Sequence, residues 1–288
     1  PKLPLAFVGL AAYRAWIELA FVGSYFGGGQ GRLPATRDVF DLSMMVVLLV
    51  GVVFAKRLSP LIEKPWARIM SLCLLLFSTA CVLLGAAFPS CPSVLCAAGA
   101  IAGGAGIAII LILWSELYGC LNPLRVALYY SASIVAAALI VYTMKGFMFP
   151  WFAVYLFVLP VVTIVSVGAA FRSIPLAERT RMPVARIAFP WKLVLWMAIF
   201  SFAFGLVQQQ LTTSAFGPHS SPGTLFVGLF VFLGVAMRKG KFDFSVIYRV
   251  ALPLMVGAFL VIPAIGNFNN LVTAFFVSGA YTACSILV

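Results

Sequence analysis

The sequence is poor in charged side chains. Asp, Glu, Lys and Arg together make up 9% of its 288 residues, whereas hydrophobic residues make up 64%. A soluble domain has about 25% charged residues, because these side chains form much of its water-facing surface. The shortage excludes a soluble enzyme, a disordered chain and a free nucleic-acid-binding protein.

Groups that commonly carry catalysis or bind metals are also scarce. The chain has a single histidine, His219, which we expect to be an ordinary residue of the loop 214–222. The six cysteines show no metal-binding spacing. Cys91 and Cys96 could pair on an oxidising face of a membrane or stay as thiols. No nucleophile, base and acid set is visible, and no paired carboxylates share an apolar run. We therefore expect no enzymatic activity, no metal site and no cofactor.

What the chain does have is a series of long apolar runs. About 20 apolar residues are needed for a helix to cross a bilayer, and lipid allows only helices or closed barrels to span it. Barrel strands would alternate in polarity, whereas these runs are continuous. The sequence predicts an all-α, polytopic transmembrane helical bundle of about ten spans, over residues 5–26, 37–55, 67–88, 93–121, 125–143, 149–171, 192–212, 223–237, 245–265 and 269–288. The chain starts at Pro1 without Met and stops at Val288 within the last run, so we expect a fragment.

The basic residues predict the orientation of these spans. With the N-terminus in the cytoplasm, 15 of the 19 Lys and Arg residues fall on the inner side, and only Arg32, Arg37 and Lys145 fall outside. This is a strong positive-inside bias. The longest inner connection, from Arg172 to Lys192, separates a six-helix half over 1–171 from a truncated half over 192–288, with 172–191 as a basic cytoplasmic linker. This plan resembles that of major facilitator folds, whose halves are parallel repeats.

Two ionisable residues lie inside the first predicted span. Arg14 and Glu18 are four residues apart and therefore share one face of a helix. Either charge alone at the bilayer centre costs about 2.5–3.5 kcal/mol on insertion scales. We expect the pair to face the interior of the bundle, where it forms either a ligand or proton site or a structural pair that orients the helix.

Polar and small residues in other spans give further candidates. Glu116, with Trp114, Tyr118 and Arg125, forms either a polar gate or part of an aromatic interfacial belt in which Glu116 snorkels or pairs with Arg125. Gln208 either faces a ligand cavity or lies at a solvated helix end. Small residues four apart let helix backbones approach closely, so we expect packing contacts at Gly99, Gly103 and Gly106.

Short motifs resemble bacterial membrane-embedded LuxR-type regulators: Trp114-Ser-Glu-Leu-Tyr118, Leu121-Asn-Pro-Leu-Arg125, Tyr129-Tyr130-Ser-Ala-Ser133 and Phe202-Ala-Phe-Gly205-Leu. The resemblance implies a major-facilitator-like sensor region in the bacterial inner membrane. It also implies a small-molecule ligand, with DNA bound only through a C-terminal helix-turn-helix domain absent from this chain. The alternative is a major facilitator secondary transporter of a small solute. The loop from Ala55 to Trp66 lacks the Gly and Asp of the usual transporter motif, which favours the sensor.

Overall fold

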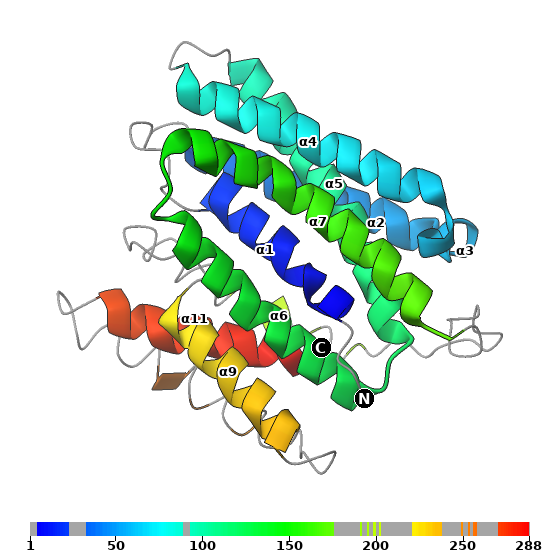
Figure 1. Ribbon diagram of the computed structural model, residues 1–288, viewed down its shortest axis with the longest axis vertical. Coiled ribbons are helices and arrows are strands. Elements are labelled where there is room, and N and C mark those ends of the chain that lie inside the picture. Colours follow the sequence, from blue (N-terminus) through cyan, green and yellow to red (C-terminus); the bar gives the residue numbers. More distant parts are fainter. Residues whose placement is uncertain are drawn as a thin grey trace. The chain divides into compact units, whose positions relative to one another are not determined.

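The structure is a computed structural model of the chain. It describes residues 5–22, 33–88, 93–175, 221–237 and 270–287, together with a few single positions between 191 and 257. Every regular element within these ranges is a helix (Figure 1). The prediction of an all-α chain is therefore confirmed.

Backbone contacts divide the chain into two compact units. The first consists of Pro1–Asn122 and Thr143–Met182, and the second of Pro123–Tyr142 and Pro183–Val288. Helix α6 (Pro123–Met144) therefore belongs largely to the second unit, although the helices before and after it in the sequence belong to the first. The predicted domain ranges, 1–171, 172–191 and 192–288, stay a prediction.

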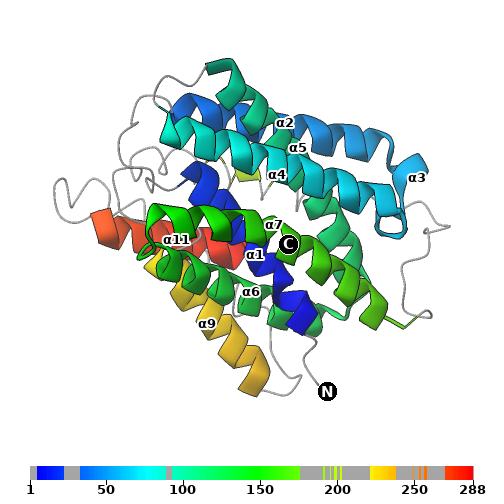
Figure 2. The same ribbon diagram turned by 45° about the horizontal axis from the view of Figure 1, so that its top comes forward.

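The first unit is built around helix α5 (Ser93–Gly119). Helices α2 (Leu33–Val53) and α4 (Pro65–Ala87) both pack against it (Figure 1, Figure 2). Helix α7 (Phe149–Ser173) contacts α4 and also α1 (Leu10–Ile17). The 3-10 turn η1 (Leu5–Gly9) precedes α1, and the π-helical turn η2 (Glu18–Val22) continues it. The short helix α3 (Ala55–Leu58) and the 3-10 turn η3 (Leu61–Glu63) connect α2 to α4.

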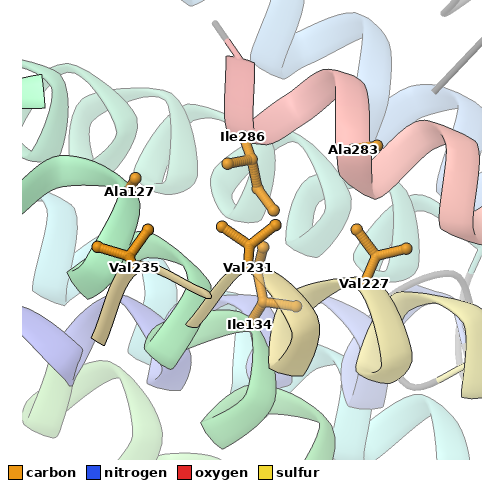
Figure 3. Packing of buried hydrophobic residues seen from close by; sticks show 7 residues of the cluster. All are labelled: Ala127, Ile134, Val227, Val231, Val235, Ala283 and Ile286. Carbon is orange, nitrogen blue, oxygen red and sulfur yellow. The ribbon is translucent and has the colours of Figure 1, made fainter. Parts of the chain in front are cut away.

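The second unit contains α6, α9 (Pro222–Met237) and α11 (Asn270–Leu287). These helices share a core of small and β-branched side chains (Figure 3): Ala127, Ile134, Val227, Val231, Val235, Ala283 and Ile286. A buried hydroxyl contact also joins two of them, because Thr282 Oγ1 donates to Thr224 Oγ1 at 3.1 Å. Apolar packing and a hydroxyl bridge are the contacts expected between helices in lipid, where no hydrophobic effect draws helices together.

Proline marks the starts of several helices. Helices α4, α6 and α9 begin at Pro65, Pro123 and Pro222. The first helical position suits proline because its fixed φ matches the helix and its missing N–H has no intrahelical acceptor there. The N-terminus of α9 is capped by Ser221, whose Oγ accepts the backbone N–H of Thr224 at 3.3 Å. Local sequence thus sets these helix boundaries.

Glycines let α5 approach its neighbours closely on two sides. A Cβ built on Gly103 would lie 2.5 Å from Ser78 Oγ of α4, closer than real side chains pack. A Cβ on Gly104 would instead clash with the carbonyl oxygen of Phe40 of α2. The other two glycines on the α4 side, Gly99 and Gly106, lie against Cys81 and Leu75. This geometry is what the packing interpretation of these glycines requires.

The expected number of spans needs correction. Within the described residues, four helices are long and apolar enough to cross a membrane, namely α4, α5, α6 and α7, so the described part supports a multi-pass chain with four candidate spans rather than ten. Helix α2 contains Arg37, Asp38 and Asp41, which lower its hydropathy. The run at 5–26 forms three helical types over residues 5–22, and α9 has only 16 residues. The predicted runs 192–212 and 245–265 lie mostly outside the described residues.

Candidate functional site

Arg14 and Glu18 are both buried. Arg14 is 5% exposed near the end of α1, and Glu18 is fully buried where the chain passes from α1 into the π-helical turn η2. The backbone N–H of Glu18 bonds to the carbonyl oxygens of Ala15 and Arg14, so the helix continues through the change of pitch. The neighbouring side chains from Leu10 to Trp16 are almost all apolar and buried. Two ionisable groups therefore lie one turn apart in an apolar interior.

Lys145 is a further charged group near Glu18 that the sequence did not reveal. It follows α6 directly and belongs, like Glu18, to the first compact unit. Burial lowers the pKa of Lys145 below its ordinary value, and the negative charge of Glu18 acts in the opposite direction. From the sequence, Lys145 was only one of three basic residues on the predicted outer side. No local pattern pointed from Lys145 to Glu18, because the runs 5–26 and 125–143 only end on the same predicted side.

Hydrogen bonds and ring contacts fix the segment around the buried pair. Trp16 Nε1 donates to Thr79 Oγ1 at 2.9 Å, and Thr79 Oγ1 donates in turn to the carbonyl oxygen of Leu75 at 2.8 Å. The Phe21 ring meets Trp16 edge-on at 5.6 Å between centroids and stacks on Phe40 at 4.4 Å. These contacts attach α1 and η2 to α4 and α2, so Arg14 and Glu18 sit on a well-anchored segment.

Glu116 binds the backbone of the loop between α2 and α4. Its two carboxylate oxygens accept the N–H groups of Leu61 and Ile62, each at 2.8 Å. Both of these residues have buried side chains in the turn η3, which contacts α5 and α4. The sequence offered a gate residue or an interfacial residue paired with Arg125. The structure gives Glu116 a backbone partner that neither interpretation included, and Arg125 lies on α6 in the second unit.

Trp114 and Tyr118 lie near the same end of α5. Their rings are 5.7 Å apart, and Tyr118 Oη donates to the carbonyl oxygen of Phe7 at 3.2 Å. Trp114 is 1% exposed, and its Nε1 has no hydrogen-bond partner within the described part of the chain. The start of the chain, the loop around η3 and the end of α5 therefore meet at one end of the first unit.

The other sequence-predicted candidates are only partly covered by the structure. Gln208, His219 and Cys91 lie outside the described residues. Among the residues that are described, no group of three or more His, Cys, Asp or Glu side chains is placed to hold a metal ion. The chemistry that the described part offers is therefore that of the buried ionisable groups Arg14 and Glu18, on α1 and η2, and of the Glu116 carboxylate bound to a loop.

Comparisons with known proteins leave this chemistry as the main guide to function. No protein-family model matches the chain, and no curated protein matches it.

Proposed function

We propose that this chain is the membrane-integral sensor region of a LuxR-type helix-turn-helix transcriptional regulator, which senses a small molecule without catalysis. The observation that carries the proposal is the burial of Arg14 and Glu18 in an apolar interior. Ionisable side chains inside membrane segments are costly, and they commonly mark ligand or ion sites. The transcriptional part of the proposal rests on the short motifs that resemble that family.

Lys145 strengthens the case for a site over a simple structural pair. A pair of opposite charges would be neutral on its own, whereas Arg14, Glu18 and Lys145 together carry a net charge of +1 when all three are ionised. A ligand that binds one arrangement of the helices better than another would shift the equilibrium between them. Lys145 is suited to such a response, because its pKa depends on its burial and on the charge of Glu18.

The proposed setting is a major-facilitator-like bundle of about ten spans in the bacterial inner membrane, with the N-terminus in the cytoplasm. Two observations support the alternation of spans within the first unit. Phe7, the turn η3 and Tyr118 come together at one end, as three predicted inner positions should. Glu18, toward the other end of the first span, acts on Lys145, which is predicted to be outside. Labelling of an introduced cysteine at Ser220, but not at Thr180, by an impermeant reagent added outside would support the proposed orientation. The reverse pattern would contradict it.

The test of sensing uses the full-length gene and a reporter of its regulated promoter. We expect Glu18→Gln to lower the response strongly, since it removes the negative charge that faces Arg14 and Lys145, and removing one partner of a buried pair typically costs about 3–5 kcal/mol. Arg14→Leu should lower the response less, because the charge of Lys145 remains near Glu18. The double variant Arg14→Leu with Glu18→Leu should reach the membrane in larger amounts than either single variant but still fail to respond. A normal response in the double variant would refute a sensing role for these two residues.

A secondary transporter of a small solute is the second candidate, because buried charges such as Glu18 also mark transport pathways. A transporter must expose its site to both sides in turn, whereas a sensor need not. Gradient-driven uptake by the purified protein in vesicles, abolished by Glu18→Gln, would favour the transporter. Ligand binding without uptake, combined with loss of transcriptional control on deleting a downstream helix-turn-helix, would favour the sensor.

A further inference from the structure

We propose that four basic residues at one end of the first unit form a docking surface for the headgroup of an anionic phospholipid. The residues, called the basic rim below, are Arg57, Lys64, Arg68 and Arg172. The proposal requires α4 to lie in a bilayer and does not depend on whether the protein senses or transports anything.

The basic rim lies on elements that the structure holds together. Arg57 is on α3, Lys64 follows η3, and Arg68 is in the first turn of α4. Lys64 Nζ donates to the carbonyl oxygen of Arg57 at 3.0 Å, which ties the two ends of the loop together and leaves the ammonium group further donors. The same loop is attached to α5 through Glu116. The basic side chains are thus carried by a fixed piece of backbone.

Arg68 connects the loop to the end of α7. A Cβ built on Gly168 would lie 3.4 Å from Arg68 Nη1, so the guanidinium group lies against the α7 backbone at that glycine. Arg172 is exposed and comes four residues after Gly168, on the same face of α7. The two guanidinium groups are therefore carried by adjoining turns of neighbouring helices.

The charge of this region is strongly one-sided. None of the four cations makes an ion pair within the described part of the chain, in contrast to Arg37, whose Nε lies 3.5 Å from Asp41 Oδ2. Glu63 is the exposed carboxylate of the same loop, so the rim and Glu63 together carry a net charge of +3. A phosphate-bearing partner complements this charge, and guanidinium groups bind phosphate oxygens in a bidentate manner.

Exposed apolar side chains beside the rim favour a lipid over a soluble phosphate compound. Trp66 is 47% exposed and Ile69 is 62% exposed, and both flank Arg68 in the first turns of α4. Val53, at the end of α2, is 75% exposed. A phospholipid presents a negative headgroup directly above its acyl chains, and tryptophan is enriched at that level of a bilayer. Basic clusters next to membrane helices attract anionic lipids in the same way.

The test measures lipid preference at Trp66. The purified full chain is placed in nanodiscs that contain brominated phosphatidylglycerol or brominated phosphatidylcholine, and the quenching due to Trp66 is taken as the difference from Trp66→Phe. We expect stronger quenching by phosphatidylglycerol in the wild type. Combined replacement Arg57→Gln, Lys64→Gln and Arg68→Gln leaves Arg172 and should remove most of the preference, with a fall of up to about fivefold for each charge removed.

Two variants control for loss of charge elsewhere and for damage to the fold. Arg37→Gln removes a cation outside the rim and should leave the preference unchanged. Arg57→Lys with Arg68→Lys keeps the charge and should retain most of the preference. If the triple variant fails to fold, the single change Arg57→Gln, at an exposed side chain, tests whether loss of one charge lowers the lipid preference. An unchanged preference in a folded neutralised variant would overturn the proposal. Loss of the wild-type preference on adding inorganic phosphate, at matched ionic strength, would also overturn it by showing a site for a soluble anion.

Discussion

Replacing Glu116 with Gln should release the loop between α2 and α4 from the end of α5. In the wild type, two carboxylate oxygens each accept a backbone N–H at 2.8 Å, from Leu61 and Ile62. Hydrogen bonds to a charged group contribute about 1.5–3 kcal/mol each, and neutral ones about 0.5–1.5 kcal/mol. A glutamine keeps one acceptor oxygen but turns an NH₂ donor toward the second N–H. The variant should therefore lose about 2–4 kcal/mol of loop attachment.

Hydrogen exchange at the amides of Leu61 and Ile62 measures this loss directly. If the loop opens and closes rapidly compared with exchange, the exchange rates of these two amides should rise roughly 30- to 1,000-fold in Glu116→Gln, as follows from about 2–4 kcal/mol. Glu63→Gln is the matched control, because Glu63 lies in the same loop but is exposed. Equal exchange in the wild type and Glu116→Gln would refute the role of Glu116 as a loop anchor. A similar rise in Glu63→Gln would attribute the effect to the net charge of the loop.

Two further predictions concern packing and electrostatics in the first unit. Gly103→Ala should lower the free energy of unfolding by about 1–3 kcal/mol, because its Cβ would overlap Ser78 Oγ. Gly119→Ala is the control and should have little effect, because no heavy atom of another residue lies within 4 Å of the added Cβ. Thermal unfolding in detergent compares the two variants, and equal stability would contradict the close approach of α5 and α4. Glu18→Gln should lower the pKa of Lys145 further, since burial already lowers this pKa and the opposing charge of Glu18 is lost. The pH dependence of Lys145 acetylation, followed by mass spectrometry, reports this pKa. An unchanged pKa would show that the two groups are not close. Because the folded state disfavours charged Lys145, the stability contributed by this group should rise as the pH increases toward the ordinary lysine pKa.

The sequence was a good guide to properties that depend on local composition. Long apolar runs predicted helices, and the runs 67–88 and 149–171 match α4 and α7 closely. The limits of α4 follow from local chemistry, since Pro65 starts the helix and Phe88, the residue before Pro89, takes an extended conformation that ends it. The type of helix was less predictable. The run 5–26 is as long as the others, yet residues 5–22 combine 3-10, α and π turns. This segment packs against α7 and α2, and such packing selects among similar backbone forms.

The candidate site could be predicted only in part. Burial of Arg14 and Glu18 followed from the cost of exposing charge to lipid. The partner of Glu116 could not be predicted from the sequence. It is the backbone of residues 61 and 62, and every residue but proline carries the same N–H group. Lys145 is separated from Glu18 by most of the first unit's sequence, and no local pattern signals their proximity. Contacts of this kind depend on how distant helices come together.

The glycines of α5 have a mechanical consequence. On one side Gly103 lets the Ser78 hydroxyl of α4 lie directly against α5, and on the other Gly104 brings α5 into contact with the backbone of α2 at Phe40. At Gly104 no Cβ of α5 separates its backbone from that of α2. A shift of α2 along α5 by one helical turn would bring the Phe40 carbonyl group against Ala100 or Ala108, which carry the Cβ that Gly104 lacks. The glycines of α5 thus hold α2 and α4 in register along its axis.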